Sequence, residues 1–113
     1  MSQITTHILD TSIGKPAEGV EISLYKQDYL DFQKLAVGTT NADGRVTNLL
    51  DVRDVLPTGI YKLKFETQHY FKNLGITSFY PFVEIIFQVN DGGEHYHVPL
   101  LLNPFGYSTY RGS

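Results

Sequence analysis

The stretch Tyr61-Lys-Leu-Lys-Phe-Glu66 carries the clearest pattern in this 113-residue sequence. Its apolar residues, Tyr61, Leu63 and Phe65, alternate with two lysines and a glutamate. Successive side chains of a β-strand point to opposite faces of the sheet. This period of two therefore predicts a strand with one buried face and one face toward water.

The same alternation occurs in Val20–Leu24 and in Val83–Val89. Three strands with apolar faces form a sheet that needs a second layer to cover it. Other short runs rich in Val, Ile, Thr and aromatic residues predict further strands. These lie at residues 3–10, 33–40, 45–49, 95–102 and 107–112.

Turn-forming residues separate the predicted strands, which is the spacing expected of an all-β fold. We predict a single domain over residues 1–113, a two-sheet antiparallel β-sandwich with about eight strands. Only residues 67–75 lack a strand pattern, and they predict one short helix that ends at Gly75. The turns are Gly14-Lys-Pro16, Asn41-Ala-Asp-Gly44, Pro57-Thr-Gly59 and Asp91-Gly-Gly93.

Composition argues against several functions. The net charge is −3, and the 9 Lys and Arg form no block that could follow a phosphate backbone, so we expect no nucleic-acid partner. The absence of Cys removes disulfides, thiolate metal ligands and cysteine nucleophiles. No apolar run approaches the ~20 residues that span a bilayer, and no secretion signal follows Met1. We expect a soluble, cytoplasmic protein.

Histidines supply the first candidate chemistry. In a strand, His95 and His97 share one face, while Tyr96, Val98 and Leu100 occupy the other. The apolar face belongs to the core, so the two imidazoles are expected in a groove or an interface. His7 lies on the face of the first strand opposite Ile4, Thr6 and Ile8, and is likewise expected away from the core.

These histidines also have other interpretations. A histidine on a strand is often a surface or hydrogen-bonded structural residue. A zinc site is the second alternative, because His7, His95 and His97 could supply three ligands and leave one position open for water. No Asp or Glu in the sequence is clearly placed to orient such ligands.

Arg45 and the C-terminus add a cation and a second candidate segment. Arg45 follows the Asn41–Gly44 turn, which sets its guanidinium at the start of a strand. The chain ends on Tyr107-Ser-Thr-Tyr-Arg-Gly-Ser113, an aromatic, strand-like segment that predicts an anchored terminus. The C-terminal carboxylate is therefore a candidate part of a site.

Several motifs together resemble the transthyretin-like family, in particular its 5-hydroxyisourate hydrolase branch. The similarity begins in the first strand and turn and spans essentially the whole chain. The motifs are Ile4-Thr-Thr-His-Ile-Leu-Asp-Thr11, Gly14-Lys-Pro16, Gly19-Val20, Thr39-Thr-Asn-Ala-Asp-Gly-Arg45, Phe79-Tyr-Pro81, His95-Tyr-His-Val-Pro-Leu-Leu-Leu-Asn-Pro104 and the terminal Tyr110-Arg-Gly-Ser113.

The resemblance implies a transthyretin-like sandwich that dimerises through edge strands and pairs into a homotetramer, with sites between the dimers. It implies that residues 107–112 lie at that interface. It also implies a catalytic set of His7, Arg45 and His97, with no metal and no cofactor. Supporting or substrate-binding residues are implied at His95, Tyr110, Arg111, Gly112 and Ser113.

The implied reaction is hydrolysis of 5-hydroxyisourate, a purine-derived molecule of urate breakdown, to 2-oxo-4-hydroxy-4-carboxy-5-ureidoimidazoline. Opening the cyclic amide requires an activated water, charge stabilisation for the oxyanion and a proton for the departing nitrogen. Histidine suits both proton transfers, and arginine suits the developing negative charge. Which histidine is the base stays open. A carrier of small ligands and a zinc hydrolase are the competing functions.

Overall fold

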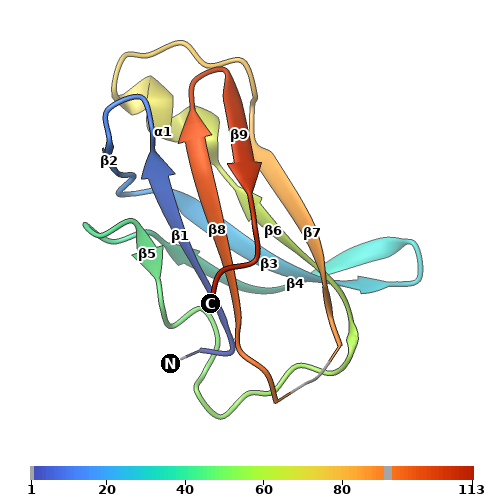
Figure 1. Cartoon of the computed structure of the whole chain (residues 1–113). Helices are drawn as coiled ribbons and strands as arrows, with labels where there is room; N and C mark the ends of the chain where they lie inside the picture. Colours follow the sequence, from blue (N-terminus) through green and yellow to red (C-terminus); the bar gives the residue numbers. More distant parts are fainter. Residues whose placement is uncertain (1, 91–92) are drawn as a thin grey trace.

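Two β-sheets packed face to face form the computed structural model, which describes residues 2–90 and 93–113 (Figure 1). The first sheet has the order β2-β1-β8-β9, with β5 also paired to β1. Its strands are β1 (Ile4–Asp10), β2 (Lys15–Pro16), β5 (Arg45–Val46), β8 (Tyr96–Asn103) and β9 (Gly106–Thr109). The second sheet has the order β4-β3-β6-β7. Its strands are β3 (Glu21–Asp28), β4 (Asp31–Thr39), β6 (Gly59–Phe65) and β7 (Val83–Val89).

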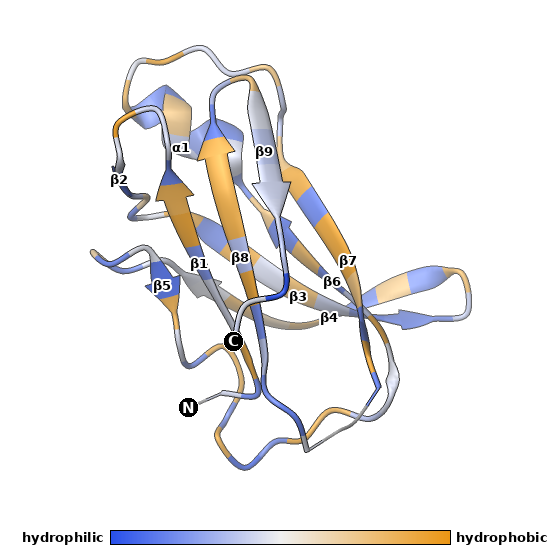
Figure 2. Cartoon of the chain, viewed as in Figure 1, coloured by the Kyte–Doolittle hydropathy of each residue, from blue (hydrophilic) through white to orange (hydrophobic). Residues whose placement is uncertain are grey.

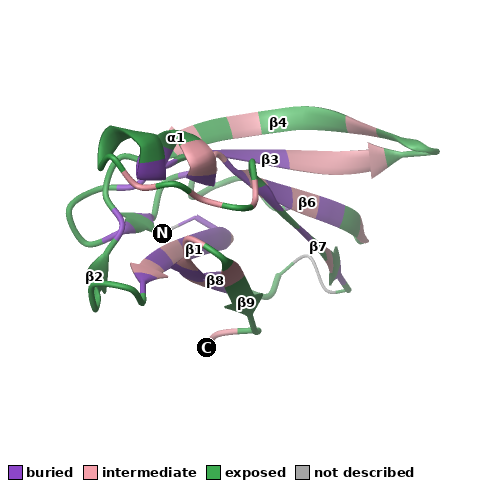
Figure 3. Cartoon of the chain, turned by 90° about the horizontal axis from the view of Figure 1, so that it is seen from above, coloured by how far each residue is buried: buried purple, intermediate pink, exposed green. Residues whose placement is uncertain are grey.

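The core lies between these two layers. Figure 2 shows the hydrophobic character of β1, β8 and β7, and Figure 3 shows buried residues on the strands that face each other across the sandwich. The inner faces predicted for β6 and β8 are confirmed, because each of their apolar residues is buried. On β6 these residues are Tyr61, Leu63 and Phe65, and on β8 they are Tyr96, Val98 and Leu100.

The single helix among the described residues, α1 (Thr67–Asn73), follows β6 directly and lies at one end of the sandwich (Figure 1). Gly75 has a positive φ of 71°, and Ile76 N–H donates to the Phe71 carbonyl at 2.9 Å, which closes the helix as predicted. Tyr70 and Phe71 are buried against the core. No helix in residues 2–90 and 93–113 is long and apolar enough to cross a membrane.

The parallel pairing of β1 with β8 positions the site. Thr5 lies opposite His97 and His7 opposite Pro99, whereas the other strand pairs among the described residues are antiparallel. Both strands therefore point their N-terminal ends the same way. The sandwich predicted from the sequence is present, with this one parallel pair inside the part of the chain that the structure describes.

Several boundaries differ from the predicted ones. The second sheet's hairpin is longer than expected, since β3 and β4 run to a turn at Tyr29–Leu30. The predicted strand 45–49 is paired only at Arg45–Val46, and Lys15–Pro16 of the predicted turn form the short strand β2. Asp91 and Gly92 of the predicted turn at Asp91-Gly-Gly93 lie outside the described residues.

The predicted terminal strand 107–112 is also interrupted. β9 ends at Thr109, and Gly112 then forms an isolated bridge with His97 in the same antiparallel register. Pro99 stands between these two paired regions and has no backbone N–H to donate. Thr109 Oγ1 instead donates to the Pro99 carbonyl at 2.7 Å.

Candidate active site

The start of β8 and the middle of β1 bring three histidines and a threonine together on the outer face of the first sheet. His7 Nδ1 lies 2.8 Å from His97 Nε2. Thr5 Oγ1 lies 2.7 Å from His97 Nδ1 and 2.8 Å from His95 Nε2. The four side chains thus form one hydrogen-bonded chain, in the order His7, His97, Thr5, His95.

His97 is held at both ring nitrogens. Its ring also stacks on that of His7, with centroids 5.0 Å apart and an angle of 23° between the planes. Among the described residues, Nε2 of His7 has no hydrogen-bond partner. Within the His7–His97 pair, the one ring nitrogen without a hydrogen bond to the described residues is therefore Nε2 of His7.

Arg45 is placed opposite His7 by the pairing of β5 with β1. The Asn41 side chain shapes the preceding turn, since its Oδ1 accepts hydrogen bonds from Asp43 N–H at 2.9 Å and from Arg45 N–H at 3.0 Å. Gly44 completes the turn with a φ of 72°. The predicted turn and the predicted position of Arg45 at a strand start are both present.

Burial and charge lower the pKa of both histidines of the pair. Desolvation, and then the Arg45 charge, lower the pKa of His7 below its ordinary value of 6.5. Burial lowers the pKa of His97 as well, followed by the charges of His7, Arg45 and His95. A neutral imidazole has a lone pair available, so the site offers a general base near neutral pH.

The C-terminus returns to this site. Gly112 N–H donates to the His97 carbonyl at 2.8 Å. A cavity of about 160 Å³ opens there, lined by Thr5, Thr6, Arg45, Thr47, His95, His97 and Ser113. The structure thus brings Gly112 and Ser113 next to the histidines and the arginine.

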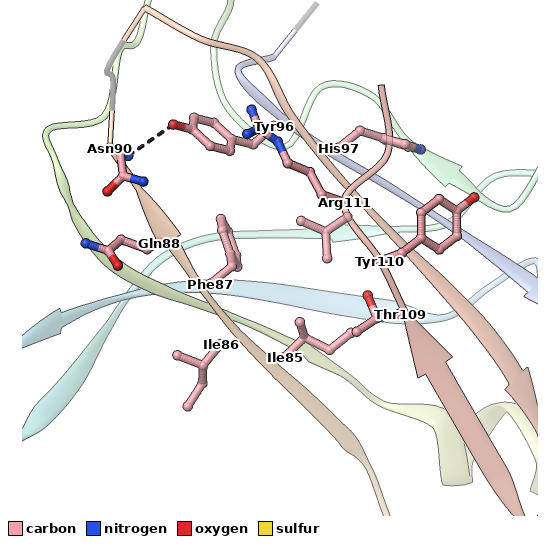
Figure 4. A pocket seen from close by; sticks show the side chains of 11 residues that line it. Ile85, Ile86, Phe87, Gln88, Asn90, Tyr96, His97, Thr109, Tyr110 and Arg111 are labelled. Atoms are coloured by element: carbon pink, nitrogen blue, oxygen red, sulfur yellow. Dashed lines mark hydrogen bonds between the residues drawn. The ribbon is translucent and has the colours of Figure 1, made fainter.

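Tyr110 and Arg111 do not line this cavity. They line a second cavity, of about 280 Å³, between β7 and the ends of β8 and β9, and His97 lines both cavities (Figure 4). Arg111 forms an ion pair with Glu94 at 2.9 Å, and its guanidinium lies 4.6 Å from the centre of the Tyr96 ring. The structure therefore splits the terminal tetrapeptide between two cavities, which the sequence did not predict.

Comparison with known proteins identifies the family. The model of the HIUase/Transthyretin family matches residues 4–112. The chain belongs to this family. A probable 5-hydroxyisourate hydrolase of Schizosaccharomyces pombe is 49% identical, over 97% of this chain and 90% of that protein.

Solved structures similar to this chain include both an enzyme and a hormone carrier. The Klebsiella pneumoniae 5-hydroxyisourate hydrolase is 42% identical, with a TM-score of 0.85 over 97% of this chain and 98% of that one. Sea bream transthyretin in complex with thyroxine is 32% identical, with a TM-score of 0.91 over 98% and 95%. Both share the fold closely, so the fold alone does not separate the two functions.

The zinc alternative finds little geometric support. The described residues contain no group of three His, Cys, Asp or Glu side chains placed to hold a metal ion. The ring nitrogens of His97 face His7 and Thr5, and His95 Nε2 faces Thr5, so the three imidazoles do not converge on one point.

Sequence reasoning missed Thr5 as part of the site. The period of two does put Thr5 on the same face as His7, and this signal was available. Its position beside His97 depends on the parallel register of β1 and β8, which no local pattern specifies.

Proposed function

We propose that this chain hydrolyses 5-hydroxyisourate to 2-oxo-4-hydroxy-4-carboxy-5-ureidoimidazoline without a metal. The observation that carries the proposal is the hydrogen-bonded His7–His97 pair beside Arg45, next to an open cavity. The relatives named as 5-hydroxyisourate hydrolases, at 42–49% identity, support the same activity.

In the proposed mechanism His7 is the general base. Its Nε2 takes a proton from water as the oxygen attacks the carbonyl of the cyclic amide. His97 orients His7 through the Nδ1–Nε2 hydrogen bond and shares the added charge. Such a proton transfer typically contributes ~10² to 10⁴ in rate. The proton then returns to the departing nitrogen, and the ring opens.

Arg45 supplies the positive charge for the oxyanion. Its side chain makes no ion pair with the described residues, so its guanidinium donors are available to substrate. A guanidinium donates several hydrogen bonds in one plane, which suits a flat, oxygen-rich ring. Removing one donor to an oxyanion typically costs ~10² to 10³ in rate.

The proposed assembly is a homotetramer, a dimer of dimers with sites at subunit interfaces. Two unpaired edges support it, since β9 ends the first sheet and β7 ends the second on the same side of the sandwich (Figure 1). Large exposed apolar residues gather on and beside these strands. They are Phe79, Phe82, Ile86, Phe105, Tyr107 and Tyr110.

A carrier of small ligands is the second candidate, favoured by the TM-score of 0.91 to a thyroxine complex. A carrier requires a cavity, but it does not require a hydrogen-bonded imidazole pair beside a cation. The two functions differ in turnover, which gives a direct test.

The test follows the ultraviolet decay of 5-hydroxyisourate generated in place from urate. Wild type should accelerate the decay, with or without EDTA, and His97→Ala should lose the acceleration. His69→Ala is the matched control, because His69 is an exposed histidine on α1 that contacts the Asn73 side chain and lies outside the site. A folded wild type without acceleration would favour the carrier, and loss with EDTA would favour a metal enzyme.

A further inference from the structure

Thr5 joins two imidazoles, yet the proposed mechanism gives it no part. Its side chain is buried, with 5% of its surface exposed, and it lies between His97 Nδ1 at 2.7 Å and His95 Nε2 at 2.8 Å. A threonine hydroxyl has one proton and two lone pairs. If both bonds are made, it must donate to one imidazole and accept from the other.

This constraint permits two arrangements of the whole chain. In the first, Thr5 donates to His95, His97 donates Nδ1–H to Thr5, and His7 donates Nδ1–H to His97. Nε2 of His7 then has a free lone pair. In the second, each of these hydrogen bonds is reversed, and Nε2 of His7 carries a proton.

We infer that Thr5 and His95 extend the His7–His97 pair into a proton relay, in which Thr5 is the positioning residue and His95 exchanges protons with solvent. This inference rests on the proposed hydrolase function. The contacts that carry it are the three hydrogen bonds of 2.7–2.8 Å that join the four side chains.

The proton balance of the relay closes over one turnover. Water gives a proton to His7 Nε2, and its oxygen bonds to the carbonyl carbon. The Nδ1–H of His7 passes to His97 Nε2, the Nδ1–H of His97 passes to Thr5, and the Thr5 proton passes to His95 Nε2. His95 then releases its Nδ1 proton to solvent.

The second half of the turnover reverses the relay. His7 donates its Nε2 proton to the departing nitrogen as the C–N bond breaks. Protons then move back along the chain, and His95 takes one from solvent at Nδ1. His7 thus serves first as the base and then as the acid. The chain alternates between the two hydrogen-bond arrangements described above.

The surroundings of His95 suit the exchange of protons with solvent. His95 is exposed, whereas His7 and His97 are partly buried. It lines the site cavity and also a neighbouring cavity of about 230 Å³. Asp54 and Glu94 line that second cavity, and Glu94 is paired with Arg111.

The test compares Thr5→Val with Thr5→Ser. Valine keeps the branched shape and removes the hydroxyl, whereas serine keeps the hydroxyl. We expect Thr5→Val to lower kcat by about tenfold or more, because a histidine held in the wrong tautomer is a poor base. Thr5→Ser should stay near wild type. Equal rates for Thr5→Val and wild type would overturn the relay.

Nitrogen-15 spectra of labelled histidines give a readout that needs no substrate. In wild type and Thr5→Ser, His97 should show one protonated and one hydrogen-bonded bare nitrogen, with shifts that change in concert with those of His95. Thr5→Val should uncouple the two residues. Independent behaviour of His95 and His97 in wild type would contradict the relay, whether or not the proposed hydrolysis is observed.

His95→Gln tests the exchange of protons with solvent separately. Glutamine can still pair with Thr5 but cannot carry a proton to solvent. We expect His95→Gln to lose rate and to regain it with imidazole in the buffer, whereas Thr5→Val should not respond. A His95→Gln variant as fast as wild type would remove His95 from the relay.

Discussion

Gly112 leaves room for the His97 ring. A Cβ at position 112 would lie 2.5 Å from His97 Cδ2 and 3.2 Å from Pro99 Cγ. We therefore predict that Gly112→Ala shifts the His97 ring or the terminal backbone while the sandwich stays folded. A displacement of about 1 Å can cost roughly 10²-fold in rate. Steady-state kcat/KM and circular dichroism together measure this effect.

The matched control for Gly112→Ala is Gly106→Ala. A Cβ at Gly106 meets only side-chain atoms of Asn103, at 3.7 and 3.8 Å, which is ordinary contact. Its kcat/KM should stay near that of wild type. An equal loss in both variants would show that the terminal segment tolerates no alanine, and would refute the ring-contact explanation.

Arg45 affects the pH dependence of activity through the histidines. Burial, and then Arg45, lower the pKa of His7, and Arg45 also contributes to the lowered pKa of His97. A base works when neutral, so activity should be present above the lowered pKa and lost as pH falls through it. The acid limb of kcat/KM should lie below the ordinary histidine pKa of 6.5 in wild type and move upward in Arg45→Ala.

Arg45→Lys separates charge from hydrogen bonding. Lysine retains the cation that lowers the histidine pKa, but it lacks the planar set of donors. Its acid limb should stay near that of wild type while its maximal kcat/KM falls. An unchanged acid limb in Arg45→Ala would contradict the electrostatic role of Arg45.

At the scale of elements, the turn before β5 fixes the distance between β5 and its partner strand β1. Gly44 has a φ of 72°, and a Cβ there would lie 2.5 Å from the Ile8 carbonyl oxygen. Gly44→Ala should therefore combine backbone strain of about 1–2 kcal/mol with a clash of about 1–3 kcal/mol. Urea denaturation measures the loss in free energy of unfolding.

Gly14→Ala is the control for backbone strain alone. Gly14 has a φ of 65°, and a Cβ added there would meet no atom within 4 Å beyond its chain neighbours. It should show only the strain contribution, and should leave activity intact. Gly44→Ala should also lose activity, because Arg45 follows directly. Equal destabilisation by the two substitutions would remove the clash from the explanation.

The pattern of alternating residues predicted the elements well because each strand has one buried face. Val83–Val89 forms β7 with the predicted bounds, and His7 and His97 lie away from the core as predicted. Strand ends were harder to predict. β9 stops at Thr109 because Pro99 on the neighbouring strand β8 interrupts the pairing.

Contacts between distant segments were not accessible from local patterns. The meeting of Thr5 with His97 depends on the β1–β8 register, across 92 positions of sequence. The division of the terminal tetrapeptide is accompanied by the Arg111–Glu94 ion pair, which also requires the folded chain. The sequence pointed to the histidines and Arg45, but it missed Thr5, and tertiary pairing determines how these side chains connect.

On the whole molecule, exposed apolar surface gathers at one side of the sandwich. Phe79 is 70% exposed, and its N–H donates to the Pro104 carbonyl at 2.8 Å, which ties the segment before β7 to the loop before β9. The sheet edges formed by β7 and β9 adjoin this place. Phe79 is therefore suited to contact a second copy of the chain, as the proposed tetramer requires.

We predict that Phe79→Glu dissociates the proposed tetramer, because a charge buried at an interface loses its hydration without gaining a partner. Sedimentation velocity should show smaller species than in wild type, and activity should fall with assembly because the proposed sites lie between subunits. Leu30→Glu is the control, since Leu30 is 93% exposed in the turn between β3 and β4, outside the β7 and β9 edges. A monomeric wild type with full activity would instead place the complete site within one chain.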